Sequence, residues 1–399
     1  MILTRIRYFF ALAAILSFMA VSCEGIGGAG GNAGSPGSPV QKENDDSGDD
    51  SGQEGGDDSG DDSGDDSGDD SGQEGGDGSG EEGGGASQPA DSVIRVATYN
   101  LLVCDGRRKE MAMDKAGATL GKAVAACKAD IISLNEIDET LVRNMPAWAA
   151  SAGATGLSWD ISHPNKVVSG ELVYYYSNGL AYNAGKFEVI SRGMSWYLSS
   201  GRLTSNSSTA SSSHVPKYCT LVWARFKHIS SGRTFYFVST HFPLADDGTD
   251  DRSYKKGEAH ERCASALEAF VLTLPDPCIV CGDLNSSAQT TDACASGYST
   301  LSRSLTNAYD ELQSKGTLDP LYRTYLGTLS GSSEKYYYTA EVFTKNHPER
   351  RIDHIMYRNA GEFSFVPRSY DTVWTTYTYG GKAWCPSDHL PVAVEFVMR

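Results

Sequence analysis

Acidic, amide and imidazole side chains stand at the ends of several short apolar runs in this 399-residue chain. Carboxylate and amide oxygens are ligands for hard cations, and a histidine beside a carboxylate transfers protons near neutral pH. These residue types suit hydrolytic acid–base chemistry assisted by a metal ion. The segments that carry them are Thr98–Asn100, Leu134–Glu136, Ser239–His241, Cys281–Asn285, Arg351–His354 and Ser387–Pro391.

Each of these residues, taken singly, also has a structural explanation. Asn100 fits a turn and Asp388 a helix N-cap. Asp283 and Asn285 together fit an Asx turn. A lone histidine such as His241 is more often a hydrogen-bonded structural residue than a catalyst. The functional prediction therefore rests on the combination of segments and on their order along the chain.

Apolar and β-branched runs predict the strands that must position these side chains. Strands outnumber helices without strict alternation, and no long linker divides them, so we expect one α/β domain over residues 93–399, with two packed sheets and outer helices. Ser/Thr-rich stretches at 199–213 and 327–333 predict loops. The predicted strands are Ile94–Asn100, Ile131–Leu134, Leu172–Tyr176, Leu180–Tyr182, Phe187–Ile190, Tyr218–Lys227, Thr234–Thr240, Cys278–Val280, Ile352–Tyr357 and Val392–Val397. The predicted helices are Lys115–Lys128, Gly257–Leu272 and Leu301–Leu312.

In this order the polar segments resemble the endonuclease/exonuclease/phosphatase superfamily. The pair GDLN and SDHLPV, after LNE and THF, is the most specific part, and the resemblance spans residues 93–399. It implies a four-layer α/β sandwich, in which helices flank two central mixed β-sheets. It also implies an active site where the strand ends of the two sheets meet.

The resemblance implies a metal site in this domain. Glu136 matches the family's metal-binding glutamate, and Asn100 and Asp388 lie where further residues approach the same cation. Oxygen ligands without a thiolate suit a hard ion. We therefore expect Mg²⁺, with Mn²⁺ or Ca²⁺ as substitutes.

The resemblance also assigns catalytic roles. Asp283 matches the aspartate that orients or deprotonates the attacking water, and Asn285 matches the amide that holds a phosphoryl oxygen. His389 would contact the scissile phosphate, while Asp353 would fix its tautomer and favour its cationic form. His241 matches a second active-site histidine. Such a set suits phosphate esters, because a cation and hydrogen-bond donors neutralise charge while a base generates the nucleophile.

The chain departs from the family pattern at two positions. Asn135 stands before Glu136 where many relatives have glutamine, which is a mild change. His354 follows Asp353 where an aromatic residue is usual. His354 is therefore either a wall of the pocket or an additional titrating group.

Two further side chains have open assignments. The resemblance leads us to expect an acidic or amide partner for His241 in the middle strands, and Glu171 and Asn178 lie in that region. Asn178 is the preferred candidate. Arg262, on the predicted helix after His241, either reaches the site or faces solvent.

The N-terminus predicts export. Arg5 and Arg7 precede an apolar run over 9–20 that is too short to span roughly 30 Å of hydrocarbon as a helix. The sequence Ala-Val-Ser before Cys23 resembles the lipobox of bacterial lipoproteins, which implies cleavage after residue 22 and acylation of Cys23. We expect a lipid-anchored protein of the bacterial cell envelope, in the outer membrane and facing the outside or the periplasm. An ordinary signal peptide with an incidental cysteine is the alternative.

Residues 23–92 are rich in Gly, Ser and Asp and offer almost no apolar side chain to bury, so we expect a disordered tether. The first 92 residues hold 20 of the 51 acidic and 3 of the 34 basic side chains. Residues 93–399 therefore carry 31 of each sign. Such a neutral domain argues against a nucleic-acid binder with a broad positive face.

Nine cysteines occur, of which eight remain in the exported domain if Cys23 is the anchor. Disulfides persist outside the cytoplasm, but spacing predicts no pairing. Cys278 and Cys281 lie in a predicted strand, where positions three apart face opposite sides, so we predict no zinc site there.

The leading functional prediction is a metal-dependent phosphoesterase that acts on an inositol phosphate, a phospholipid head group or nucleic acid, as a monomer. One alternative is that the particular activity is that of a non-specific extracytoplasmic nuclease. The other is an inactive surface binding module on the same fold. All six polar segments keep their functional residue types, which favours catalysis over a decayed site.

Overall fold

The computed structural model describes residues 92–102, 113–137, 139–160, 177–205, 219–243, 258–288, 295–319, 351–379 and 381–399. The predicted signal peptide, Cys23 and the tether up to residue 91 lie outside these residues, as do Glu171, the predicted strand 172–176, the loop 327–333 and most of the loop 199–213. Among the described helices, none has the length and apolar character needed to cross a membrane.

One sheet has six strands in the order β12-β15-β1-β2-β4-β3. β1 and β2 run parallel, and the other neighbours are antiparallel, so the sheet is mixed. Its central strands are apolar on both faces, as expected for a sheet covered on both sides. Its strands are β1 (Val93–Asn100), β2 (Ile131–Ile137), β3 (Leu157–Asp160), β4 (Ser177–Asn183), β12 (Phe365–Thr372) and β15 (Val392–Met398).

The second sheet has seven strands in the order β10-β11-β9-β8-β7-β5-β6. It is also mixed, because β8 and β9 are parallel within an otherwise antiparallel arrangement. Its strands are β5 (Phe187–Tyr197), β6 (Leu203–Thr204), β7 (Thr220–His228), β8 (Thr234–His241), β9 (Cys278–Asp283), β10 (Thr306–Asn307) and β11 (Asp353–Arg358). A separate hairpin joins β13 (Tyr377–Tyr379) to β14 (Lys382–Trp384).

Aromatic side chains hold the two sheets face to face. Phe235 of β8 meets Phe365 of β12 edge-on, with ring centroids 5.4 Å apart. Tyr182 of β4 packs on Phe226 of β7 at 5.0 Å. Such pairs bury large apolar areas in preferred ring geometries, so they stabilise the packed sheets as well as filling the space between them.

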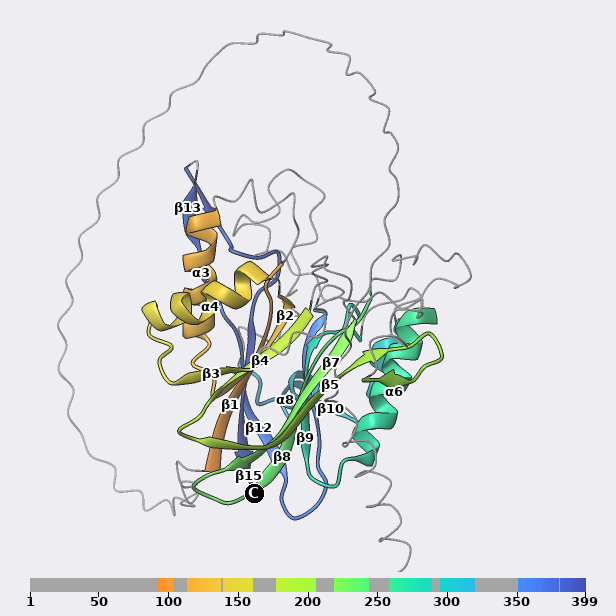
Figure 1. Cartoon of the computed structure of the whole chain (residues 1–399). Coiled ribbons are helices and arrows are strands. Elements are labelled where there is room, and N and C mark those ends of the chain that lie inside the picture. Colours follow the sequence, from red (N-terminus) through yellow and green to blue (C-terminus); the bar gives the residue numbers. More distant parts are fainter. Residues whose placement is uncertain are drawn as a thin grey trace, which may run out of the picture. The chain divides into compact units, whose positions relative to one another are not determined.

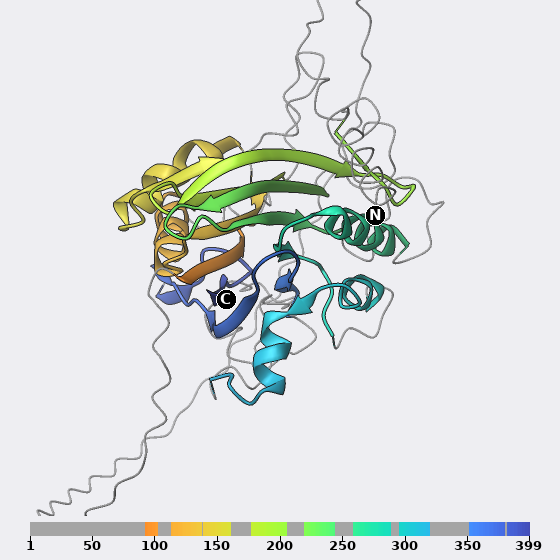
Figure 2. The same cartoon turned by 90° about the horizontal axis from the view of Figure 1, so that it is seen from below.

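Helices cover the outer faces of both sheets (Figures 1 and 2). α3 (Met113–Ala126) and α4 (Glu139–Ser151) pack on the six-stranded sheet through a cluster that includes Leu120 and Met145. α6 (Glu258–Thr273) covers the seven-stranded sheet through Leu267 and Val271. α7 (Ala295–Leu301) packs beside α6 on that side. α8 (Ala308–Ser314) instead packs Tyr309 and Leu312 into the core between the sheets, next to β12. The predicted sandwich of two mixed sheets with flanking helices is confirmed.

The predicted helix Leu301–Leu312 is wrong. α7 ends at Leu301, and β10 then pairs with β11 before α8 begins. The interruption has a local cause, because the Asn307 side chain accepts a hydrogen bond from the N–H of Tyr309 and caps α8. Helical spacing in the sequence does not show this restart.

The six described cysteines are free thiols and buried: Cys127, Cys219, Cys263, Cys278, Cys281 and Cys385. Cys278 packs under α6, whereas Cys281 packs between the sheets, so the predicted opposite orientation of these two side chains is confirmed. Burial raises the pKa of Cys278 to about 12 and that of Cys281 well above its usual value.

Candidate active site

The polar strand ends of the two sheets meet at one edge of the sandwich. Asn100 ends β1 and Asp283 ends β9, and they belong to different sheets. The Asn100 amide nitrogen nevertheless donates a hydrogen bond of 3.0 Å to Asp283 Oδ2. His241 is the register partner of Asp283 on one side, and Asp353 is its partner on the other.

A β-bulge in β2 aims Glu136 at this edge. Leu134 pairs with Gly179 and Ile137 with Ser177, so β2 carries one extra residue. Glu136 has a φ of +54°, which is rare for a residue with a side chain. Bulges and positive φ values re-aim single side chains next to functional sites. The Glu136 carboxylate accepts a hydrogen bond of 3.0 Å from the Asn100 amide.

Asp283 is the centre of the site. Its carboxylate oxygen Oδ2 lies 3.5 Å from His241 Nε2 and 3.7 Å from His389 Nε2. Its other oxygen accepts a 2.8 Å hydrogen bond from the Asn285 backbone N–H. Burial alone would raise the pKa of Asp283, but the hydrogen bond from His241 and the positive charge of both histidines hold it well below its usual range. Asp283 is therefore ionised at neutral pH.

His389 and Asp353 form a buried pair, as the resemblance implies. His389 Nδ1 lies 2.8 Å from Asp353 Oδ2, and the two side chains are 5% and 0% exposed. Burial lowers the pKa of His389, but Asp353 and Asp283 raise it by more, so its pKa lies well above the usual value. His389 is therefore an imidazolium at neutral pH, with Nε2 directed towards Asp283.

His241 faces the same carboxylate from the other side. Burial lowers the pKa of His241, but the hydrogen bond to Asp283 and the charge of that carboxylate together raise it by more. The pKa of His241 therefore lies above its usual value. The amide nitrogen of Asn285 lies 3.3 Å from His241 Nε2 and donates a 2.8 Å bond to the Phe242 carbonyl. Because the ionised Asp283 carboxylate only accepts, His241 donates to it from Nε2.

Asn135 joins strands from both sheets beneath the site. Its amide nitrogen donates to Asn178 Oδ1 at 2.8 Å and to the Thr240 carbonyl at 2.9 Å, and its oxygen accepts from the Asp283 N–H at 3.0 Å. The sequence marks this residue only as a mild departure from glutamine. Its role as a bridge needs contacts across 105 and 148 residues, which no local pattern reveals.

Asn178, the preferred partner of His241, accepts a hydrogen bond from Asn135, whose amide also donates to the carbonyl of Thr240, the residue before His241. Its amide nitrogen donates to the Thr220 carbonyl at 2.8 Å and to the Thr220 hydroxyl at 2.9 Å. Both N–H groups are thereby used, so only the Asn178 oxygen could serve His241. The pairing of Asn178 with His241 stays a prediction.

His354 and Arg262 have other contacts. Burial lowers the pKa of His354 to about 4, and Nε2 lies 2.7 Å from the Ser286 carbonyl, so His354 adds no cation at neutral pH. Arg262 donates to the Ser199 carbonyl and to Glu258, the latter at 2.6 Å. It therefore ties α6 to the turn after β5.

The residues of the site fit a hard divalent cation. Glu136, Asp283, Asp353 and Asp388 bring four carboxylates to one edge, against two histidines, and no thiolate lies among the described ligand-type atoms there. Asp283, Asp353 and His389 each offer one ligand-type atom, and these atoms lie within 4.8 Å of one another. Oxygen-rich, negatively charged sites of this kind favour Mg²⁺ or Mn²⁺.

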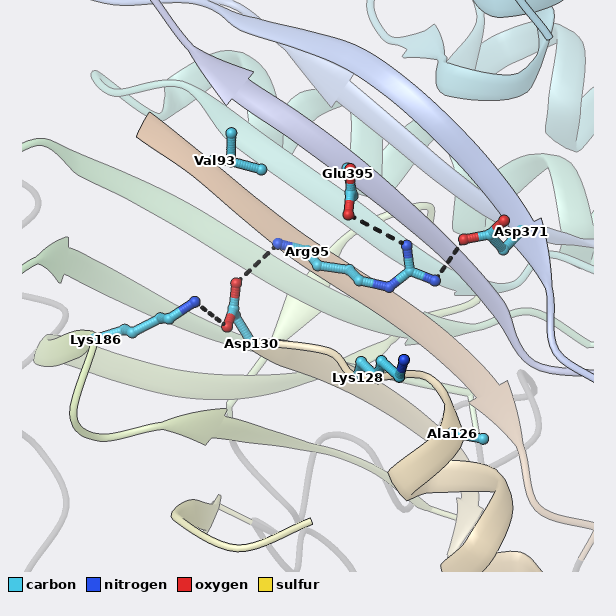
Figure 3. Close-up of a pocket in the computed structure, with 8 residues that line it drawn as sticks. All are labelled: Val93, Arg95, Ala126, Lys128, Asp130, Lys186, Asp371 and Glu395. Carbon is cyan, nitrogen blue, oxygen red and sulfur yellow. Dashed lines mark hydrogen bonds and ion pairs between the residues drawn. The ribbon is translucent and has the colours of Figure 1, made fainter. Parts of the chain in front are cut away.

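A separate groove of about 550 Å³ opens at the other end of β1 (Figure 3). Val93 and Arg95, at the start of β1, line it, whereas Asn100 ends that strand. Most of its charges pair with one another: Arg95 lies 2.5 Å from Asp371, and Lys186 lies 2.6 Å from Asp130. The groove is therefore a structural ion-pair network, away from the active site.

Comparisons with known proteins agree with this architecture. The model of the Endonuclease/Exonuclease/phosphatase family matches residues 97–389. A mannosyl-6-phosphatase from Bacteroides thetaiotaomicron is 20% identical, with a TM-score of 0.55, and the alignment covers 76% of this chain and 99% of that one. The D. rerio TDP2 complexed with single strand DNA product is 14% identical, with a TM-score of 0.51 and coverage of 77% and 99%.

A family protein from Bacteroides thetaiotaomicron also shares the fold, at 20% identity and a TM-score of 0.54, covering 76% of this chain and 97% of that one. No curated protein matches the sequence. The family match extends from β1 to His389, and thus includes every strand end that builds the site. The chain belongs to the endonuclease/exonuclease/phosphatase family.

Proposed function

We propose that this chain is a divalent-metal-dependent phosphoesterase that hydrolyses a phosphomonoester or phosphodiester by attack of water. The observation that carries the proposal is the placement of ionised Asp283 between the His389 imidazolium and the Nε2 of His241, with Glu136 joined to the same carboxylate through Asn100. This arrangement combines a proton acceptor, cationic donors and an oxygen-rich metal site in one buried edge.

Glu136 and Asp388, with the Asn100 amide oxygen, would hold the cation. When bound, a divalent cation neutralises negative charge on the phosphate and favours ionisation of water. We assign Asp283, Asp353 and His389 to proton transfer and hydrogen bonding rather than to ligation. The His389 imidazolium has no lone pair for a metal, and its two ring nitrogens face the carboxylates of Asp353 and Asp283. Metal titration distinguishes ligands from the other residues: Glu136→Gln should weaken metal binding, whereas Asp353→Asn should not.

The chain's own residues supply the remaining steps. Asp283, fixed by the Asn285 N–H, accepts the proton of the attacking water. His389, held by Asp353, donates a hydrogen bond to a phosphoryl oxygen as negative charge builds there. His241 lies at the same carboxylate and the Asn285 side-chain amide lies 3.3 Å from His241, so both would contact the remaining phosphoryl oxygens.

For the substrate, the neutral charge of residues 93–399 disfavours duplex DNA and supports a small phosphate ester, such as an inositol phosphate or a lipid head group. The mannosyl-6-phosphatase and the DNA-bound TDP2 share the fold at low identity and point to different substrates. The nuclease and the inactive binding module are the alternatives. We also propose that Cys23 is acylated and anchors the protein in the cell envelope, because small residues after a short apolar run precede it.

The test is a hydrolysis screen of the chain from residue 23, with Mg²⁺ and with chelator. The substrates are p-nitrophenyl phosphate, bis-p-nitrophenyl phosphate, mannose 6-phosphate, inositol phosphates, sphingomyelin, RNA, single-stranded DNA and plasmid DNA. Asp283→Asn should lose activity, whereas Asp371→Asn, which removes a carboxylate from the remote groove, should not. Equal activity of parent and Asp283→Asn, or no chelator-sensitive hydrolysis at all, would contradict the proposal.

A further inference from the structure

The turn after β9 carries two residues of the proposed site and has an unusual backbone. Asp283 ends the strand, and Asn285 follows with a φ of +46°. This left-handed conformation is unfavourable for a residue with a Cβ atom, although asparagine tolerates it better than most. Contacts from outside the turn must therefore hold it.

Two buried histidines contact the carbonyl groups on either side of Asn285. His260 Nε2, on α6, lies 2.6 Å from the Leu284 carbonyl, and His354 Nε2, on β11, lies 2.7 Å from the Ser286 carbonyl. A carbonyl oxygen only accepts, so both histidines donate from Nε2. One side chain comes from the helix α6 and the other from β11, the strand next to β9, and they are 1% and 3% exposed.

The tautomer of His354 follows from its second contact. Asn307 Oδ1 accepts from the Tyr309 N–H, so the Asn307 amide nitrogen is the group that faces His354 Nδ1, at 2.9 Å. An amide nitrogen only donates, and Nδ1 therefore carries no proton. His354 is a neutral donor with both ring nitrogens engaged, and Asn307 fixes its direction towards the turn.

The backbone that these histidines hold carries or contacts the proposed catalytic side chains of the turn. The Asn285 N–H, which belongs to the peptide whose carbonyl His260 binds, donates to Asp283 Oδ1 at 2.8 Å. The Asn285 side chain donates to the Phe242 carbonyl at 2.8 Å and lies 3.3 Å from His241. Rotation of the Leu284–Asn285 peptide would therefore break the hydrogen bond that fixes the Asp283 carboxylate. The Ser286 carbonyl, which His354 holds, fixes the backbone directly after Asn285 and with it the direction of the Asn285 side chain.

We infer that His260 and His354 are positioning residues for the proposed phosphoesterase, acting through the Leu284–Asn285 and Ser286–Ser287 peptides of the turn. The expected effect on catalysis rests on the proposed function. The expected effect on the conformation of the turn rests on the two hydrogen bonds alone. Residue 354 departs from the aromatic residue that the family resemblance leads one to expect, and its hydrogen bond to Ser286 gives that departure a role.

The packing around His260 shows that its ring position is tightly defined. Phe242 meets the ring edge-on, with centroids 5.3 Å apart. A Cβ atom at Gly297 of α7 would lie 2.0 Å from His260 Cε1. Gly297→Ala should therefore displace the imidazole without removing it, while Ser299→Ala, at an exposed position of the same helix, is the matched control.

The experiment compares His260→Phe and His354→Phe, which remove the donors and keep a ring, with His260→Gln and His354→Gln, which restore an amide donor. Loss of one such hydrogen bond should lower kcat about tenfold, equivalent to about 1.4 kcal/mol, with KM little changed. The Gln variants and Ser299→Ala should keep more of the activity than the Phe variants and Gly297→Ala.

A double-mutant cycle separates positioning from general stability. In an Asn285→Gly background, His354→Phe should cost at most about threefold, because residues that act as one unit are non-additive. The same tenfold loss in both backgrounds would overturn the inference. So would Phe variants that equal the parent in kcat.

Hydrogen–deuterium exchange tests the same contacts without activity. Peptides covering residues 282–288 should exchange faster in both Phe variants, while those covering 131–137 should not change. If the parent hydrolyses no phosphate ester, the proposed function fails, and this exchange pattern still decides whether the histidines hold the turn. Unchanged exchange over 282–288 would overturn the inference.

Discussion

The pairing of Asp353 with His389 gives the sharpest test of the proposed chemistry. The two groups are 2.8 Å apart and almost fully buried, so their hydrogen bond is charge-assisted and poorly screened. Asp353→Asn keeps the shape and removes the charge. Such bonds contribute about 1.5–3 kcal/mol, which predicts a loss of about ten- to a hundredfold in kcat.

The pH dependence has a defined sign. Asp353 raises the pKa of His389, so the parent should keep the cationic form, and its activity, to well above pH 6.5. In Asp353→Asn the pKa of His389 falls, and the alkaline limb of the kcat/KM profile should move to lower pH. The raised pKa also contributes stability that is present below about pH 6.5 and is lost as pH rises through the folded-state pKa.

The assay is initial-rate hydrolysis of bis-p-nitrophenyl phosphate from pH 5 to 10. It compares the parent with Asp353→Asn, His389→Ala and the double variant that carries both changes. His389→Ala should cost at least about a hundredfold, by analogy with the loss of one preorganised donor. The double variant should be little worse than His389→Ala. Strictly additive losses, or an alkaline limb that does not move in Asp353→Asn, would refute the reasoning.

Other predictions concern the metal, the core and the N-terminus. Glu136→Gln should weaken Mn²⁺ binding in a calorimetric titration and lose activity that excess Mg²⁺ partly restores, because a neutral amide replaces a charged ligand; unchanged affinity would exclude Glu136 as a ligand. Gly282→Ala should destabilise the fold by about 3 kcal/mol in urea unfolding, since its Cβ would lie 1.8 Å from the Thr240 carbonyl oxygen; a parent-like midpoint would contradict this. Removing residues 24–92 should leave turnover and Tm unchanged, and a lower Tm would show that the tether packs on the domain. Cys23→Ser should abolish labelling by a fatty-acid probe, and equal labelling would remove the anchor from consideration.

The sequence predicts the strands well because their signal is local. β1, β8 and β9 begin within one residue of the predicted positions, and their apolar runs end in the polar residues that form the site. β12 was not predicted, since Pro367 interrupts its pattern and coincides with a bulge in the pairing with β15. α4 was missed for a related reason, because Pro146 lies inside it.

The convergence of the site residues could be expected only through the family resemblance. Nothing in the spacing of Asp353 and His389 shows that they touch. The bulge at Glu136 and the bridge made by Asn135 depend on pairing with distant strands, and single-sequence patterns carry no such information. The sequence leaves His354 as either a pocket wall or a titrating group, whereas burial, which lowers its pKa to about 4, and its two hydrogen bonds make it a neutral structural donor.

The six buried thiols have a practical consequence. A thiolate is the reactive form of cysteine, and burial of these side chains both excludes reagents and raises their pKa, as for Cys127 at about 12. Alkylation at these positions therefore requires opening of the core. Peptide-resolved labelling with iodoacetamide would then report, thiol by thiol, which part of the sandwich opens first: Cys127 for the α3 side, Cys263 for the α6 side and Cys281 for the interface between the sheets.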